Sequence, residues 1–399
     1  MADYTKINGV AAANIVKVDG VAYASIAKCD GATSPSLGAT RWVVGADDGL
    51  IAHASNSDRT SWTTYNSITG SVTTDNKFDI AFGKDNSGNG IYICTRNGAQ
   101  RELQISTTDV TSTDDWTDIS FDGGSNRQIM QVLWGARSDG NVAGTWFAVG
   151  QQTNEEIFRS TDGGANWSAI DLSSLTDHAS GVYINGIASD GQGNWMFGQA
   201  DGTSARLYYS TNDGASFAVS TPFDSGGGKG VPGRIHGIIF TNNSWVISYS
   251  NSSQHHVRSC AASDITDWGT EKRLNSLAHM SSNQQKAQMA ANSSGRVVIT
   301  TTQNESDLYF FDVNGKTITG NETSSNEFGT GDNYVNLSMS GDNIKDVATD
   351  GNTWLLACQD GDIWESTNDG ASWSQIADNQ GADSADDFTS ITCDVTLPL

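Results

Sequence analysis

Short apolar runs separated by polar turns recur along the chain at a spacing of about fifty residues. Polar turns at 138–140, 189–191 and 349–351 precede such runs, and the aliphatic runs 91–93 and 297–299 keep the same spacing. Several short strands with turn signals are typical of one propeller blade. Seven such units predict an all-β fold, a seven-bladed β-propeller of four-stranded blades. Five runs open with a tryptophan: Trp42, Trp146, Trp195, Trp245 and Trp354.

A second pattern marks a hairpin turn later in the unit, at 160–167, 210–217 and 366–373. Its serine and its Asp or Asn can accept hydrogen bonds from turn amides. Its glycine suits a positive φ, and its final aromatic residue has a large apolar surface to bury. We therefore assign these turns a structural role. The residues are Ser160, Asp162, Gly164, Trp167, Ser210, Asn212, Gly214, Phe217, Ser366, Asn368, Gly370 and Trp373.

These turns resemble the Asp box (S-x-D-x-G-x-x-W) of the bacterial neuraminidase repeat, which lies between the two outer strands of a propeller blade. Two copies have Asn in place of Asp, and Phe217 replaces the tryptophan. Degenerate copies at 55–62, 106–116 and 259–268 keep the period, and one copy near residue 320 has decayed beyond recognition. The resemblance covers nearly all of the chain after residue 40 and implies the same propeller fold.

The C-terminus supplies a strand that the first unit lacks. Residues 388–395 resemble the innermost strand at 344–350, whereas the first unit begins directly at Trp42. We expect residues 388–396 to pair beside the strand at Trp42 and close the ring without an open edge. The expected domains are an N-terminal anchor at 1–34, a linker at 35–40 and the propeller at 41–399.

The N-terminal segment 1–34 has a different repeat, with a period of eleven residues. Its Asn-Gly and Asp-Gly pairs predict hairpins, and its Ala-rich segments leave short helices as an alternative. So small a unit cannot bury its apolar positions alone. We expect it to dock on its own propeller, on sister copies or on a larger assembly. The anchor residues are Ile7, Gly9, Val18, Gly20, Ile26 and Gly31.

Composition narrows the classes of function. The net charge is −24, and residues 1–40 are neutral, so the acidic excess lies in the propeller. Such a surface repels nucleic acid. Five scattered cysteines predict neither a disulfide framework nor a zinc site, and we expect no cofactor or metal. No stretch is long and apolar enough to span a membrane. The first residues lack a signal-peptide pattern, so we expect no export by that route.

Catalytic motifs are weak. Sialidases with Asp boxes use three arginines, an acid and a Tyr–Glu pair, and their Arg-Ile-Pro signature is matched only by the Arg-Ile-His at 234–236. The Gly-rich segment 226–230 lacks the ending of a phosphate loop. Adjacent His255 and His256 would point to opposite faces of a strand, and we expect an exposed pair. Paired acids could hydrolyse a glycoside, but the candidates lie mostly in turn motifs: Asp139, Asp190, Asp350 and Asp362. We assign no catalytic residue.

The N-terminal repeat resembles short N-terminal repeats in predicted virion proteins of marine tailed bacteriophages. That resemblance implies a docking module that fixes a display domain to a particle. We therefore favour a non-enzymatic virion structural protein on the head or tail, made in the host cytoplasm. Residues 1–34 would bind other virion proteins or sister copies of the same segment, which would make a homo-oligomer, and the propeller could bind a host-surface glycan. One alternative is a sialidase-like or other glycan-hydrolysing enzyme. Another is an assembly factor similar to the Asp-box proteins that assist photosystem II, which would be expected to carry a targeting signal or a basic patch.

Overall fold

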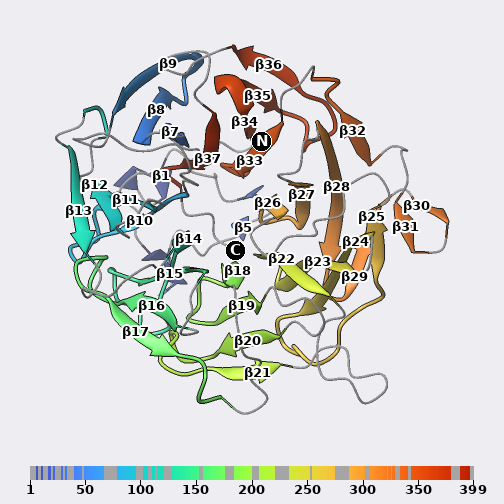
Figure 1. Cartoon of the computed structure of the whole chain (residues 1–399), viewed down its shortest axis with the longest axis horizontal. Helices are drawn as coiled ribbons and strands as arrows, with labels where there is room; N and C mark the ends of the chain where they lie inside the picture. Colours follow the sequence, from blue (N-terminus) through green and yellow to red (C-terminus); the bar gives the residue numbers. More distant parts are fainter. Residues whose placement is uncertain are drawn as a thin grey trace.

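The computed structural model describes most of the propeller and three strand pairs near the N-terminus. The described ranges are 6–7, 10–11, 17–18, 21–22, 28–29, 32–33, 40–46, 49–66, 79–95, 102–106, 110–112, 115–120, 128–151, 156–175, 184–199, 206–220, 233–251, 254–274, 287–301, 306–320, 322–324, 326–328, 333–339, 343–378 and 387–395. Seven antiparallel blades form a ring around a central axis (Figure 1). This confirms the predicted seven-bladed propeller of four-stranded blades.

Each apolar run forms the second strand of a blade. In blades 2 to 7, the innermost strand ends at the polar turn that precedes this run. The innermost strands, in blade order, are β37 (Phe388–Cys393), β10 (Ile80–Lys84), β14 (Gln128–Gly135), β18 (Ile184–Ser189), β22 (Arg234–Thr241), β26 (Ala287–Ala291) and β33 (Ile344–Thr349). The second strands are β7 (Arg41–Ala46), β11 (Gly90–Thr95), β15 (Thr145–Gln151), β19 (Trp195–Gln199), β23 (Ser244–Asn251), β27 (Arg296–Thr301) and β34 (Trp354–Cys358).

The two outer strands of each blade are joined by the turns of the second sequence pattern. The third strands are β8 (Leu50–Ser55), β12 (Glu102–Ser106), β16 (Glu156–Ser160), β20 (Leu207–Ser210), β24 (Gln254–Ala261), β28 (Asp307–Asn314) and β35 (Ile363–Ser366), the last preceded by the 3₁₀ turn η5 (Gln359–Gly361). The fourth strands are β9 (Asp58–Asn66), β13 (Trp116–Ser120), β17 (Ser168–Asp171), β21 (Ala218–Ser220), β25 (Lys272–Leu274), β29 (Thr317–Thr319) and β36 (Ser374–Ala377).

The core lies between neighbouring blades. Each second strand is covered on both faces, because a blade stands between two others in the ring. This explains why the runs are continuously apolar rather than alternating. Four of the tryptophans that open these runs are fully buried, and Trp245 is nearly so: the four are Trp42, Trp146, Trp195 and Trp354.

The C-terminal strand completes the first blade. β37 pairs antiparallel with β7, placing Cys393 opposite Trp42 and Phe388 opposite Ala46. The sheet order β37-β7-β8-β9 matches the order of the other blades. The predicted closure of the ring is therefore correct, and β7 has no open edge.

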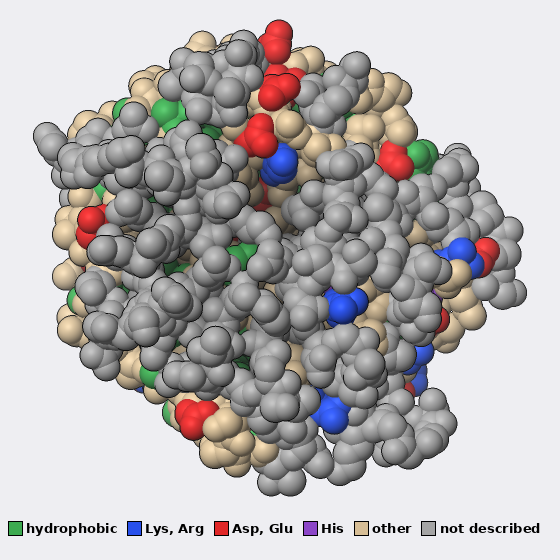
Figure 2. Space-filling view, in the orientation of Figure 1, with side chains coloured by type: hydrophobic (Ala, Val, Ile, Leu, Met, Phe, Trp, Pro, Cys, Tyr) green, Lys and Arg blue, Asp and Glu red, His purple; other side chains and the backbone are tan. Residues whose placement is uncertain are grey.

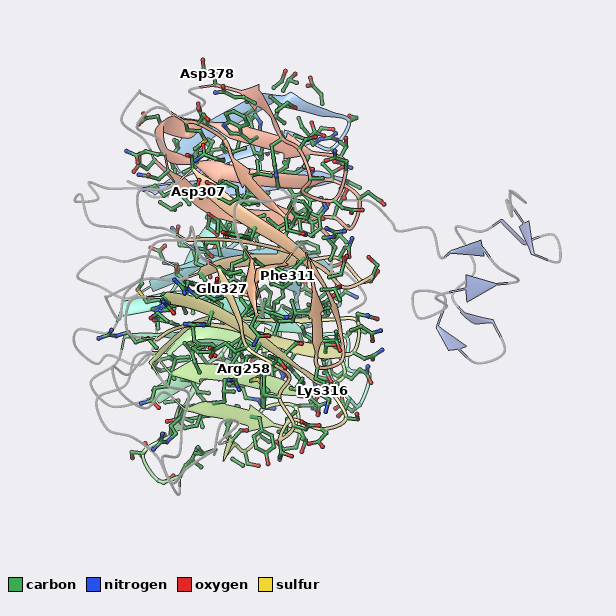
Figure 3. All side chains as sticks on the ribbon, turned by 90° about the vertical axis from the view of Figure 1, so that its right-hand side faces the viewer. Arg258, Asp307, Phe311, Lys316, Glu327 and Asp378 are labelled. Atoms are coloured by element: carbon green, nitrogen blue, oxygen red, sulfur yellow. The ribbon has the colours of Figure 1, made fainter. Side chains whose placement is uncertain are left out.

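The ring has two unlike faces. Short turns joining first to second strands and third to fourth strands lie on one side, which we call the turn face. The opposite side is the loop face. It holds the strand ends that lead into the loops between second and third strands and into the connections between blades. β28 runs between the two: Asp307 lies toward the loop face and Lys316 toward the turn face (Figure 3). Figure 2 shows the loop face.

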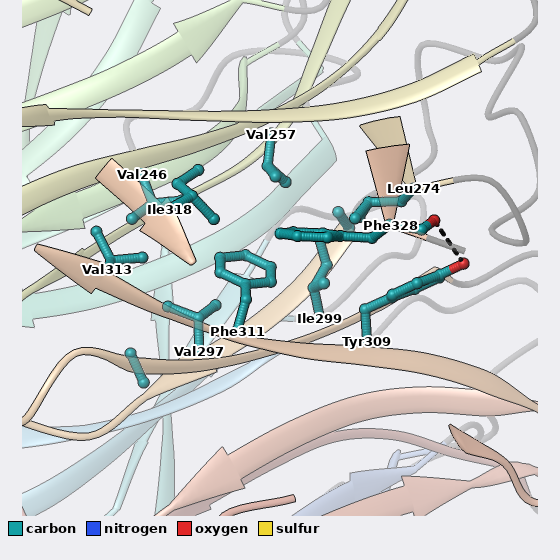
Figure 4. Close-up of a cluster of buried hydrophobic side chains, with 12 residues drawn as sticks. Val246, Val257, Leu274, Val297, Ile299, Tyr309, Phe311, Val313, Ile318 and Phe328 are labelled. Carbon is teal, nitrogen blue, oxygen red and sulfur yellow. Dashed lines mark hydrogen bonds between the residues drawn. The ribbon is translucent and has the colours of Figure 1, made fainter. Parts of the chain in front are cut away.

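The connection between blades 6 and 7 adds three strands that the repeat pattern did not predict. β31 (Glu327–Phe328) pairs parallel to β25 of blade 5 and antiparallel to β30 (Glu322–Ser324), while β32 (Tyr334–Asn336) pairs with β28 of blade 6. Phe328 is fully buried against Phe311, with ring centroids 6.0 Å apart (Figure 4). This connection therefore covers the outer edge of the core between blades 5 and 6.

Three separate two-stranded hairpins recur near the N-terminus. They are β1 (Lys6–Ile7) with β2 (Val10–Ala11), β3 (Lys17–Val18) with β4 (Val21–Ala22), and β5 (Lys28–Cys29) with β6 (Ala32–Thr33). The described alanines lie in strands, as the turn pairs predicted. Of the expected anchor residues, Ile7 and Val18 lie in these strands, and Gly9, Gly20, Ile26 and Gly31 fall outside the described residues. Within the described residues, no helix is long and apolar enough to cross a membrane.

Candidate functional site

The three repeat turns (160–167, 210–217 and 366–373) share the hydrogen bonds made by their serine and by their Asp or Asn, and the two that end in tryptophan also share a bond from its indole. In the first, the Gly164 amide donates to Ser160 Oγ at 2.9 Å, and the Asn166 amide donates to Asp162 Oδ1 at 2.9 Å. Trp167 Nε1 donates to the Gly164 carbonyl at 2.9 Å. Corresponding serine and Asn bonds recur in the other two turns. Gly164, Gly214 and Gly370 all have positive φ. In each turn the serine and the Asp or Asn thus accept hydrogen bonds from turn amides, and the glycine lies at the position that has a positive φ.

The repeat turns also contact the preceding blade, which the sequence pattern did not reveal. Asp213 of blade 4 accepts the Ser138 amide of blade 3 at 2.8 Å and the Ser138 hydroxyl at 2.6 Å. Asn292 Nδ2 of blade 6 lies 3.3 Å from Asp369 Oδ1 of blade 7. A side chain at Gly214 would overlap Phe147 of blade 3. The repeat turns are therefore joints between blades.

Degenerate copies keep part of this geometry. Trp62 Nε1 and Trp268 Nε1 each donate to the carbonyl three residues earlier, at 2.9 and 2.8 Å, as Trp167 does. The decayed copy expected near residue 320 is a two-residue turn at Gly315 and Lys316 between β28 and β29. Lys316 Nζ lies 2.7 Å from Asp267 Oδ2, so a salt bridge links this turn to blade 5.

Where the ring closes, residues from the two ends of the propeller form the same turn that a continuous chain forms in blade 7. In blade 7, Asp350 Oδ1 accepts the amides of Asn352 and Thr353, at 3.0 and 2.8 Å, just before Trp354. In blade 1, Asp394 Oδ1 accepts the amides of Thr40 and Arg41, at 2.6 and 3.0 Å, just before Trp42.

The Asp394 amide also donates to the Arg41 carbonyl at 3.1 Å, and the Asp350 amide donates to the Thr353 carbonyl at 3.2 Å. We call Thr40, Arg41 and Asp394 the closure joint.

Two buried carboxylates hold the closing strand from its other side. Ser390 Oγ lies 2.9 Å from Asp346 Oδ2 of blade 7 and 3.3 Å from Asp79 Oδ1 of blade 2. The Ile391 amide donates to Asp346 Oδ2 at 2.9 Å, and the Val132 amide of blade 3 donates to Asp79 Oδ2 at 2.8 Å. β37 is thereby connected to the neighbouring blades through polar groups that are themselves satisfied.

A charged cluster between blades 4 and 5 has the residue types of a catalytic site but no reactive nucleophile. The Tyr249 hydroxyl donates to Glu271, and His256 Nδ1 and Arg258 Nη2 lie 3.3 and 3.5 Å from the Glu271 carboxylate. The His256 hydrogen bond lowers the pKa of Glu271 most; burial opposes this and Tyr249 adds to it, leaving a pKa of about 2. Burial raises the pKa of the Tyr249 phenol far above its ordinary value. A phenol held neutral in this way is a poor nucleophile.

The expectation of an exposed histidine pair is wrong. His255 and His256 are both buried, because β24 lies between β23 and β25 with other blades on both sides. Their side chains do point to opposite faces: His255 Nε2 lies 2.6 Å from Ser248 Oγ, and the His256 ring stacks on Tyr249 at 5.4 Å. Fully buried side chains in such packing support structure rather than chemistry.

The catalytic candidates are dispersed. Asp139, Asp190 and Asp350 cap turns in three different blades, and Asp362 accepts a hydrogen bond from Gln375. In the part of the chain that the structure describes, Arg234 is the one arginine on an innermost strand. The segment 226–230 lies outside the described residues. No group of three His, Cys, Asp or Glu side chains that could hold a metal is found among the described residues.

A polar cavity of about 480 Å³ lies at the turn-face end of blade 1, beside the closure joint. Its described lining residues include no Phe, Tyr or Trp, whereas small-molecule sites are usually lined by hydrophobic and aromatic groups. The lining is Thr40, Arg41, His53, Ala54, Ser55, Asp58, Ser61 and Thr63.

Comparisons with known proteins identify the fold. No family model matches the sequence, and the curated proteins give no significant match. The structure is similar to YCF48 bound to D1 peptide, with a TM-score of 0.50, 11% sequence identity and coverage of 82% of this chain and 87% of that chain. It is also similar to the Cps50 (Swd1) β-propeller domain of Myceliophteria thermophila, with a TM-score of 0.52, 8% identity and coverage of 82% and 93%. At these identities the likeness shows a β-propeller and nothing finer.

Proposed function

We propose that the protein is a non-enzymatic display protein of a tailed bacteriophage, fixed to the head or tail by residues 1–34. The propeller would be the displayed domain, with adhesion to a host-surface glycan as its role. The observation behind this proposal is the N-terminal repeat of three hairpins, each paired only within itself in the described strand pairing. An isolated two-stranded hairpin is marginally stable in water at best. Such a repeat therefore needs a partner surface.

The propeller itself supports a scaffold role. Its repeat turns act as joints between blades, and the carboxylates that hold β37 are hydrogen-bonded within the protein. The blade that completes the ring uses the C-terminal strand rather than residues 1–34. The described strands of the N-terminal segment pair only among themselves, which supports their use for attachment rather than for closing the ring.

Purified virions test the proposal. Full-length protein is expected in the particle, and a truncated protein starting at Leu37 is expected to fold, remain soluble and fail to join particles. A matched control carries Ile7→Asp and Val18→Asp, which keep the length of the segment but remove apolar surface from two hairpins. Mass spectrometry of the particles reads out all three. Equal incorporation would contradict the anchor, and absence of the full-length protein from every particle would contradict the virion assignment.

A second candidate is a peptide-binding assembly factor. The support for this candidate is the fold likeness to YCF48, whose solved structure has a D1 peptide bound. This candidate predicts that a truncated protein starting at Leu37 captures the same cellular peptide partner as the full chain. The virion proposal predicts that the N-terminal segment is required for assembly.

We expect the protein to have no glycan-hydrolysing activity. Purified protein should release no product from sialosides or common polysaccharides, because the candidate acids Asp139, Asp190 and Asp350 cap turns in three different blades. Turnover abolished by substitution of a single carboxylate would instead favour the glycan-hydrolysing alternative.

A further inference from the structure

We propose that the closure joint is the point at which the propeller resists a pull transmitted through its N-terminal segment. Tension arriving through residues 1–39 would be opposed by two strand ladders at once, so that the ring stays closed under load. This inference rests on the proposed anchoring role of the N-terminal repeat. It concerns how the propeller withstands a pull, which the anchoring role alone does not specify.

The chain enters the propeller at a point held from both sides. The Thr40 and Arg41 amides donate to Asp394, and the Thr40 hydroxyl donates to the same carboxylate. On the opposite side, the Asn56 amide donates to the Thr40 carbonyl at 3.0 Å. A pull on residue 39 is therefore first met by groups from β37 and from the turn after β8.

Beyond this point the load passes into an interior strand of the blade. β7 pairs with β37 from Trp42 to Ala46, and with β8 from Arg41 to Gly45. Hydrogen bonds in antiparallel ladders are perpendicular to the strands. A pull along β7 loads both ladders together instead of releasing one bond after another. Attachment to an outermost strand such as β9, which pairs only with β8 in its sheet, would engage a single ladder.

Side-chain packing resists sliding of β7. Trp42, Val43 and Val44 are fully buried, and Trp42 Nε1 donates to Asn56 Oδ1 at 2.8 Å. A shift of one residue would exchange the two faces of the strand, and a shift of two would draw Trp42 out of the core. Either movement must break apolar contacts at the same time as both ladders.

The partner strand β37 is itself fixed to other blades. Ser390 contacts Asp346 of blade 7 and Asp79 of blade 2, and the Ile391 amide donates to Asp346. The load on β7 is thereby distributed over the blades on both sides of the seam.

The entry point also gives a direction. Thr40 and Asp394 occupy the position of a first-to-second-strand turn, and such turns lie on the turn face. A particle attached through residues 1–39 would therefore lie on the turn-face side, and the loop face would be directed away from it. Force exerted by a ligand held on the loop face would then run along β7.

Single-molecule force spectroscopy on the full-length chain tests the joint. The chain is pulled between its N-terminus and a cysteine introduced by Ser204→Cys between β19 and β20 of blade 4, in a Cys29→Ser background. The other four native cysteines are buried: Cys94, Cys260, Cys358 and Cys393. Asp394→Ala is compared with Asp85→Ala. Asp85 Oδ1 accepts the Ser87 and Asn89 amides, both at 2.8 Å, in an equivalent turn of blade 2 that does not hold the residues at which the chain enters the propeller.

Asp394→Ala is expected to raise the unfolding rate under load about tenfold, the effect of losing a hydrogen bond to a charged group. Asp85→Ala is expected to leave that rate within about twofold of the parent, although both lose a turn cap. Thr40→Val, which removes only the hydroxyl donor, should give a smaller rise and serves if Asp394→Ala does not fold. Equal effects of the two Asp variants, or stepwise release of blade 1 at low force in the parent, would overturn the proposal. Because no particle is present, this result is independent of whether residues 1–34 join virions.

Discussion

The turn in blade 7 and the closure joint in blade 1 share one geometry with different chain connectivity. Asp350 caps amides two and three residues ahead of it, whereas Asp394 caps the amide of Thr40, 354 positions away in sequence. In both, the capped amides directly precede the buried tryptophan of the second strand. The comparison teaches that an aspartate just after the innermost strand can cap these amides whether or not the chain between them is continuous.

Removal of the C-terminal strand should have the largest effect on this comparison. Deletion of residues 386–399 removes Asp394 and β37, leaving β7 with an open edge. We expect an aggregating or proteolysed product. Thermal melting and limited proteolysis check this. A deleted protein with an unchanged melting temperature would show that the seam is dispensable.

Truncation of a core tryptophan should come next. Trp146→Ala removes a fully buried side chain, and we expect a loss of roughly 3–5 kcal/mol in the free energy of unfolding. The matched variant Trp167→Ala removes a repeat-turn side chain that is only partly buried, and roughly 2 kcal/mol is expected. Chemical denaturation measures both. A larger loss at Trp167 would mean that the joints between blades, rather than the second strands, dominate stability.

Removal of the two equivalent caps sharpens the comparison directly. Asp350→Ala leaves turn amides without their acceptor, and about 1–2 kcal/mol is expected. Asp394→Ala should cost more, about 2–3 kcal/mol, because no peptide bond holds β37 beside β7 once the cap is lost. Denaturant midpoints of the two variants give the difference. If Asp350→Ala reduced the free energy of unfolding more than Asp394→Ala, the missing chain connection at the closure joint would not determine the contribution of the cap.

The smallest effect is expected from the charged cluster between blades 4 and 5. Since the pKa of Glu271 falls from 4.5 to about 2 on folding, its stabilising contribution is complete above pH 4.5 and is lost as the pH falls toward 2. Glu271→Gln should therefore be less stable than the parent at neutral pH, and the difference should shrink between pH 4.5 and 2. Melting temperatures across that range test it. A constant difference would show that the carboxylate charge is not involved.

The sequence predicted the ring because each blade repeats the same requirement. A strand covered on both faces must be apolar throughout, so the runs at Trp42, Trp195 and Trp354 mark second strands wherever they occur. A turn that needs a positive φ keeps its glycine, so Gly164, Gly214 and Gly370 mark the outer hairpins. The strand at 388–395 was recognisable because the first unit lacked a partner for β7.

Features without a repeat could not be predicted. β31 pairs with blade 5 although it lies in the connection between blades 6 and 7, and nothing local to Phe328 specifies so distant a partner. The contact between Asp213 and Ser138 depends on the distance between blades, which a linear pattern does not contain. His255 and His256 were misjudged for the same reason, because their burial comes from the neighbouring blades.

The seam also places a demand on biosynthesis. Thr40 leaves the ribosome long before Asp394, and at about 5–20 residues per second the intervening 354 residues take roughly 20–70 s to translate. During that interval β7 has one edge without its partner, and such an edge can pair with another nascent chain. Blade 1 is the first blade begun and the last completed, so folding cannot finish in the order of synthesis. Chaperones in the cell would therefore meet this protein as an open ring.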